Sequence, residues 1–117
     1  MSSDWFAAQA NCSQYSAHLV TISSESENSF LILEILKNNY NQRQFWIGLK
    51  RSPFDYSAWA WVDASRVSFT DWFPGQPDDH QSAEGCAELA SWSGKWKWND
   101  FNCSNKARFV CEKGKID

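Results

Sequence analysis

Two short clusters of oxygen-bearing side chains lie between residues 76 and 100, and a cysteine is close to each. The set comprises Gln76, Asp78, Glu84, Asn99 and Asp100. Hard cations such as Ca²⁺ take about six to eight oxygen ligands from carboxylates, amide carbonyls and backbone carbonyls. These residues supply that chemistry without a thiolate or an imidazole, so the donor set favours calcium over zinc.

Pro77 lies between Gln76 and Asp78 in the turn-rich segment 74–79. A cis bond before this proline would point the side-chain oxygens of its two neighbours to the same side. On this triplet alone, an ordinary polar turn is the simpler interpretation. The second cluster, the intervening Glu84 and the neighbouring cysteines favour a metal site instead.

Length and charge narrow the class of protein. The chain has 117 residues, which is enough for one domain over 1–117, and eight Trp and eight Phe make it rich in aromatic rings. A net charge of −3 argues against a nucleic-acid-binding face. The sequence contains no apolar run long enough to span a membrane. The chain has two histidines far apart in sequence and no recognisable pair of nucleophile and base, so we do not expect an enzyme. We interpret His18 as a residue that supports the fold and not as a catalytic one.

The pattern of apolar residues predicts both helices and strands. We expect a helix from Asp4 to about Ser16 with Asp4 as N-cap, and a second that starts at the capping box Ser24–Glu27. The second helix should run to about Asn39 and partly bury Phe30, Leu31, Leu33, Ile35 and Leu36. Strands are predicted at 44–50, 59–61, 86–89, 95–98 and 107–112.

Eight motifs in this order resemble the C-type lectin-like domain, the carbohydrate-recognition module of animal C-type lectins, from Trp5 to Glu112. They are Trp5 to Cys12, His18-Leu-Val-Thr-Ile22, Phe45-Trp-Ile-Gly-Leu49, Trp72-Phe-Pro-Gly75, Gln76-Pro-Asp78, Cys86-Ala-Glu-Leu89, Trp98-Asn-Asp100 and Phe109-Val-Cys-Glu112. The resemblance implies an α+β fold, with two helices flanking small antiparallel sheets and a long calcium-binding loop region.

Four cysteines allow three disulfide connectivities, between which sequence alone does not choose. The resemblance implies Cys12–Cys111 and Cys86–Cys103, and paired cysteines in a small domain favour an extracellular or secreted setting. The chain shows no apolar leader, so we expect a trimmed leader or a module of a longer secreted chain or receptor. Asn11 and Asn102 match the glycosylation pattern, and we interpret both as chance matches.

The resemblance also implies the chemistry of the site. One calcium ion would be held by Gln76, Asp78, Glu84, Asn99 and Asp100, and two vicinal sugar hydroxyls would complete its coordination. In this family Gln-Pro-Asp accompanies galactose-type ligands, so we expect glycans ending in galactose or N-acetylgalactosamine. Sugar contacts are expected from Gln76, Asp78, Glu84 and Asn99, and also from His80, Trp92 and Trp96. The alternative is a protein-recognition or ice-binding module on the same fold.

Two further expectations come from departures from the family pattern. Lys50 and Gly85 stand where carboxylates of a second calcium site are usual, so we expect only one ion; Asp55 and Asp79 alone make a poor site. In this family a strand usually precedes the first helix, and here only four residues stand before Trp5. The closing strand would then keep one open edge, so we expect either pairing with another chain in a homo-oligomer or a less stable domain that depends on Cys12–Cys111.

Overall fold

The computed structural model describes residues 2–38, 41–78 and 85–113. Helix α1 (Trp5–Ser13) begins where Asp4 caps it, because the Asp4 carboxylate accepts a hydrogen bond from the Ala7 amide at 2.8 Å. The helix ends a turn earlier than predicted. Its buried residues are Trp5, Ala8 and Cys12, the face expected from their spacing.

Helix α2 (Glu25–Asn38) starts with half of the predicted capping box. The Ser24 hydroxyl accepts from the Glu27 amide at 3.1 Å, whereas the Glu27 carboxylate accepts from the amide and hydroxyl of Ser23. The prediction of its buried face was wrong for Phe30, Leu33 and Leu36, which are exposed. At about 100° per residue, the buried Asn28, Leu31 and Ile35 form one stripe, and the other three residues point away from it.

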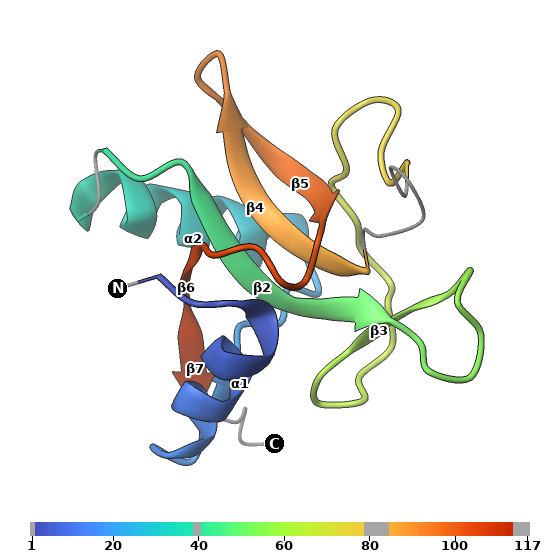
Figure 1. Ribbon diagram of the computed structural model, residues 1–117. Helices are drawn as coiled ribbons and strands as arrows, with labels where there is room; N and C mark the ends of the chain where they lie inside the picture. The colour runs from blue at the N-terminus through green and yellow to red at the C-terminus, as the bar shows by residue number, and fades with distance from the viewer. Residues whose placement is uncertain (1, 39–40, 79–84, 114–117) are drawn as a thin grey trace.

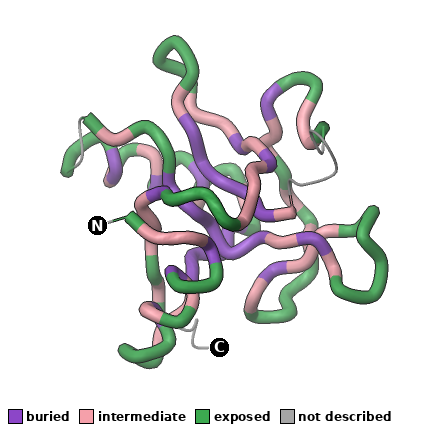
Figure 2. The backbone as a smooth tube through the Cα atoms, viewed as in Figure 1, coloured by how far each residue is buried: buried purple, intermediate pink, exposed green. Residues whose placement is uncertain are grey.

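The main sheet has the order β3-β2-β4-β5, and all three pairings are antiparallel. Its strands are β2 (Gln44–Arg51), β3 (Trp59–Trp61), β4 (Cys86–Trp92) and β5 (Lys95–Phe101). Alternation along β2 sends Phe45, Ile47 and Leu49 into a core shared with α2, and Trp46 into a second core shared with α1. The two helices therefore cover different faces of this sheet, whose inner strands are the buried part of the molecule (Figures 1 and 2).

The closing strand differs from the prediction because it is split. β6 (Arg108–Phe109) runs parallel to β2, while β7 (Cys111–Lys113) pairs antiparallel with β1 (Ala17–Leu19) in a separate small sheet. Upstream of both, Ser3 and Ala107 exchange backbone hydrogen bonds of 3.0 and 3.1 Å. The closing segment thus joins the N-terminal residues, β2 and β1 in turn.

The disulfide pairing is confirmed. Cys12–Cys111 and Cys86–Cys103 have Cα–Cα separations of 5.5 and 5.2 Å. The first ties α1 to β7, and the second ties the start of β4 to the segment after β5. In the described part of the chain, no helix is both long enough and apolar enough to cross a membrane.

Candidate calcium and sugar site

The segment before Gln76 runs along the outer edge of β5. The Trp98 amide donates to the Asp71 carbonyl, and the Phe73 amide donates to the Trp98 carbonyl, both at 2.8 Å. Figure 1 shows this yellow segment beside the end of β5. Because strand edges present a row of backbone donors and acceptors, β5 fixes where the loop that follows can lie.

The loop brings Gln76, Asp78 and Asp100 together. The Gln76–Pro77 peptide bond is cis. The Asp78 amide donates both to Gln76 Oε1, at 3.2 Å, and to Asp100 Oδ1, at 3.1 Å. Gln76 Nε2 in turn donates to Asp78 Oδ2 at 3.4 Å. Three of the predicted oxygen-bearing residues, far apart in sequence, are therefore linked by direct hydrogen bonds.

Asn99 is the neighbour of Asp100 on β5 and is held by a different partner. Successive residues of a strand point to opposite faces, so Asn99 and Asp100 project to either side of β5. The Asn99 amide nitrogen donates to Glu88 Oε2 at 2.9 Å, and these two residues are paired in register across β4 and β5. A predicted ligand is thus held by a residue that the sequence interpretation did not single out.

Asp100 is fully buried and has a cation beside it. The Arg51 guanidinium lies 3.4 Å from Asp100 Oδ2 and donates to the Tyr56 carbonyl at 2.9 Å. It is placed over the rings of Tyr56 and Trp59, at 4.7 and 4.6 Å from their centroids. Buried charges are stable when they are paired and hydrogen-bonded, and this one is. The strand predicted at 44–50 extends one residue further, so Arg51 ends β2.

Glu88 is the second residue that the sequence interpretation missed. It is 1% exposed in the middle of β4, and among the described residues its Oε1 atom has no hydrogen-bond partner. Burial raises the pKa of Glu88 to about 7, although hydrogen bonds from Asn99 and Gln44 act to lower it; the nearby charge of Asp100 adds to the rise. A lone acid inside the apolar run 86–90, opposite Asn99, was the signal available in the sequence.

The remaining predicted site residues lie apart or are not described. Glu84, His80 and Asp79 fall outside the described residues. Trp92 stacks on Phe73, with ring centroids 3.9 Å apart and planes 10° apart, and it is four residues along β4 from Glu88, roughly 13 Å. Trp96 is partly buried and packs near Phe45. Phe73 adjoins the loop, since its carbonyl accepts a hydrogen bond from the Gln76 amide at 2.9 Å. The sugar contacts expected of the two tryptophans stay a prediction.

The chemistry of the donors fits a hard cation. The described members of the set contribute two carboxylates, from Asp78 and Asp100, and two amide oxygens, from Gln76 and Asn99. No group of three or more His, Cys, Asp or Glu residues suited to a metal occurs within 2–38, 41–78 and 85–113. A donor set of carboxylate and amide oxygens suits calcium better than metals that prefer imidazole or thiolate. Asp55, the other described candidate, accepts hydrogen bonds from Ser57.

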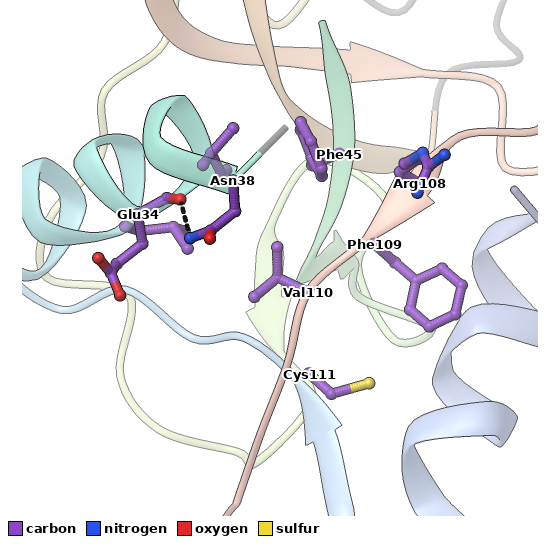
Figure 3. A pocket seen from close by; sticks show the side chains of 9 residues that line it. Glu34, Asn38, Phe45, Arg108, Phe109, Val110 and Cys111 are labelled. Atoms are coloured by element: carbon purple, nitrogen blue, oxygen red, sulfur yellow. Dashed lines mark hydrogen bonds between the residues drawn. The ribbon is translucent and has the colours of Figure 1, made fainter. Parts of the chain in front are cut away.

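Two hollows lie elsewhere, between α2 and the closing segment. One, of about 410 Å³, is lined by residues of α2, by Phe45 and by segment 108–111 (Figure 3). The other, of about 520 Å³, lies on the other side of Val110, against Val20, Ile22 and Phe30. Neither contains a predicted ligand, and both are lined mainly by apolar side chains, so their chemistry does not suit a cation or a sugar.

Comparison with known proteins identifies the family. The family described as Lectin C-type domain matches residues 1–113. This chain is a C-type lectin domain. It is 33% identical to perlucin of Haliotis laevigata over 116 residues, covering 97% of this chain and 72% of perlucin. It is 35% identical to the galactose-specific lectin nattectin of Thalassophryne nattereri over 112 residues, covering 96% and 69% of the two chains.

Solved structures agree with the fold of this C-type lectin domain. The crystal structure of the C-type lectin CEL-I from Cucumaria echinata superposes with a TM-score of 0.88 at 27% identity, covering 95% of this chain and 83% of that one. The carbohydrate-recognition domain of the mouse scavenger receptor C-type lectin has a TM-score of 0.82 at 35% identity, covering 99% and 86%. The predicted α+β C-type lectin fold is confirmed.

Proposed function

We propose that this C-type lectin domain binds carbohydrate in a calcium-dependent manner, with a preference for terminal galactose or N-acetylgalactosamine. One observation carries the proposal. The Asp78 amide bonds to Asp100 Oδ1 at 3.1 Å, which holds the Gln76-Pro77-Asp78 loop against the strand that also bears Asn99. The name of nattectin, a galactose-specific lectin, supports the choice of sugar.

Each residue has a distinct role in this proposal. The oxygens of Gln76, Asp78, Asn99 and Asp100 would hold calcium together with Glu84. A bound calcium ion supplies a positive centre that two neighbouring sugar hydroxyls coordinate. Around it, carboxylates only accept hydrogen bonds from the sugar, while amide nitrogens donate them. Asn99 keeps a second amide proton for this purpose after one goes to Glu88. The arrangement of donors and acceptors then selects the sugar.

We further propose that the chain holds a single calcium ion. Arg51 supplies a fixed positive charge 3.4 Å from Asp100, so this buried carboxylate is already neutralised on one side. Lys50 and Gly85 stand where additional carboxylates would be needed. Calorimetric titration of chelator-stripped protein with calcium should give one ion per chain, and a stoichiometry of two contradicts this.

The setting and assembly belong to the same proposal. Two disulfides fit an extracellular protein with no catalytic role, acting alone or as part of a longer receptor. Within the described ranges β7 pairs with β1 alone, so its other edge is available for a second copy. Dimers would strengthen binding through avidity. Sedimentation of a strict monomer contradicts the dimer.

A glycan array tests the function directly. The array is probed with calcium and again with chelator. Retention on galactose-terminated glycans only with calcium is expected. Binding that persists in chelator contradicts the proposed site, and no binding to any glycan under either condition favours the protein-recognition or ice-binding module.

A further inference from the structure

Glu88 occupies an unusual place for a carboxylate. It lies in the middle of β4, 1% exposed, between Trp46 of β2 and Asn99 of β5 in the sheet register. Burial of an acid in such a strand is costly unless its oxygens are hydrogen-bonded, and no described residue bonds to Oε1. An apolar side chain at this position would pack in the sheet at lower cost, so stability does not explain the acid.

The bonds that Glu88 does make point to Asn99. Its Oε2 atom accepts from Asn99 Nδ2 at 2.9 Å and, more weakly, from Gln44 Nε2 at 3.5 Å. The two ends of an asparagine amide are nearly equal in size, so shape alone does not orient them. A carboxylate can only accept, and a reversed Asn99 would put its oxygen against the Glu88 oxygen. The acid therefore dictates that the nitrogen end faces β4.

We propose that Glu88 is a positioning residue: its carboxylate holds one amide proton of Asn99 and thereby turns the Asn99 oxygen toward the calcium-binding side. The inference rests on the proposed function, since Asn99 must serve as a ligand for its orientation to matter. Residues that hydrogen-bond to metal ligands fix their orientation, and their loss lowers metal affinity by about 10–100-fold.

Two variants at position 88 separate this role from a structural one. Glu88→Met removes the acceptor and keeps an unbranched side chain of similar size. Glu88→Gln retains one acceptor oxygen, which Gln44 helps to hold in place. We expect calcium affinity, measured by calorimetry, to fall by about tenfold or more in Glu88→Met and to stay within about threefold of wild type in Glu88→Gln.

A matched control lies on the same strand. Lys97 is two residues before Asn99 and pairs with Asp71 at 2.8 Å, away from Glu88. Lys97→Met breaks a polar contact of β5 without touching the proposed site, so its calcium affinity should equal that of wild type. The unfolding midpoint of Glu88→Met in chelator should not fall, because the variant removes a buried carboxylate with an unpartnered oxygen.

A second readout needs no calcium. In chelator, NMR of the Asn99 side-chain amide, identified by its loss in Asn99→Ala, should show two well-separated proton signals, one of them slow to exchange. Glu88→Met should bring them together, and Glu88→Gln should keep them apart.

The outcomes are distinct. The inference stands if Glu88→Met loses calcium affinity and the separated amide signals without losing stability, while Glu88→Gln retains both. It is overturned if Glu88→Met binds calcium like wild type, if Glu88→Gln loses as much as Glu88→Met, or if the midpoint falls together with affinity. If wild-type protein binds no calcium, the proposed function is wrong, and the amide signals alone decide whether Glu88 orients Asn99.

Discussion

The buried polar groups on the two sides of β5 differ in how many of them have hydrogen-bond partners. On one side, the Trp98 indole donates to Asn28 Oδ1 at 3.0 Å, Asn28 Nδ2 donates to Asp71 at 2.9 Å, and Asp100 has Arg51 and the Asp78 amide as partners. On the other side, Glu88 bonds to Asn99 and Gln44 through one oxygen only. We call these the Asn28 side and the Glu88 side.

Both sides of β5 bear proposed ligands, but the sides differ in how far their buried polar groups are hydrogen-bonded. Fully satisfied buried networks rigidify a fold, whereas partly satisfied ones cost stability and are kept where they serve a site. The Asn28 side fixes α2, the loop and β5 relative to one another. The Glu88 side holds one predicted ligand and leaves a carboxylate oxygen unpartnered. Substitutions on the two sides should therefore change the free energy of unfolding in opposite directions.

The largest loss of stability is expected from Arg51→Met. The change leaves the fully buried Asp100 carboxylate without its cation, which should cost about 3–5 kcal/mol of unfolding free energy in chelator. Urea denaturation of chelator-stripped protein measures it. A loss below about 1 kcal/mol would show that Asp100 does not depend on this pair.

A smaller loss is expected from Asn28→Leu. The variant leaves the buried Trp98 indole without its acceptor and Asp71 without one donor, for a loss of about 2–3 kcal/mol. Asn38→Leu on the same helix is the matched control, because Asn38 is exposed and its side chain donates to the Glu34 carbonyl within its own helix, so the effect should stay within about 0.5 kcal/mol. Equal losses in the two variants would contradict the role given to Asn28.

Glu88→Gln should raise the free energy of unfolding, and only at high pH. The pKa of Glu88 in the folded chain is raised to about 7 from 4.5, so its contribution to stability is greatest below pH 4.5 and is lost as pH rises through 7. A neutral side chain avoids this loss, up to about 3 kcal/mol above pH 8. Denaturation in chelator should find the variant more stable than wild type at pH 8 and similar at pH 4. Parallel pH profiles would show that Glu88 titrates normally.

The smallest effect on stability is expected from changes in the loop that faces β5. Gln76→Glu with Asp78→Asn exchanges the amide and the acid between a half-buried and an exposed residue, so the free energy of unfolding should change by less than about 0.5 kcal/mol. The hydrogen-bonding polarity around the sugar reverses, and preference should shift from galactose toward mannose. Competition with the two free sugars measures it. An unchanged preference in the variant would remove the loop from sugar selection.

Sequence predicted the parts of this molecule that depend on local pattern. The first helix cap at Asp4, the hairpin of β4 and β5 and the strand at Phe45 to Leu49 follow from alternation and capping. The disulfide partners required the family resemblance, because spacing alone left three connectivities open. Gln76, Asp78, Glu84, Asn99 and Asp100 were predicted as one set of ligands from their chemistry, and that role stays a prediction.

The features that the sequence did not predict depend on contacts between residues that are far apart in the chain. Arg51 lies one residue beyond the predicted strand 44–50, and its pairing with Asp100, 49 residues away, follows only from the fold. Glu88 was passed over because it stands in an apolar strand, and its partner is known only once β4 and β5 are in register. The rings of Trp92 and Trp96 pack on Phe73 and Phe45, and their expected contact with the sugar stays a prediction. Each of these needed a tertiary contact that no local pattern encodes.

The central claim, that the loop at 76–78 and the end of β5 form one calcium-dependent sugar site, is tested most directly by titrating galactose into the protein in a calorimeter. The titration is made with saturating calcium and repeated after chelation. We predict one sugar bound per chain with calcium and no heat of binding in chelator. Equal binding under both conditions, or binding under neither, would contradict the claim.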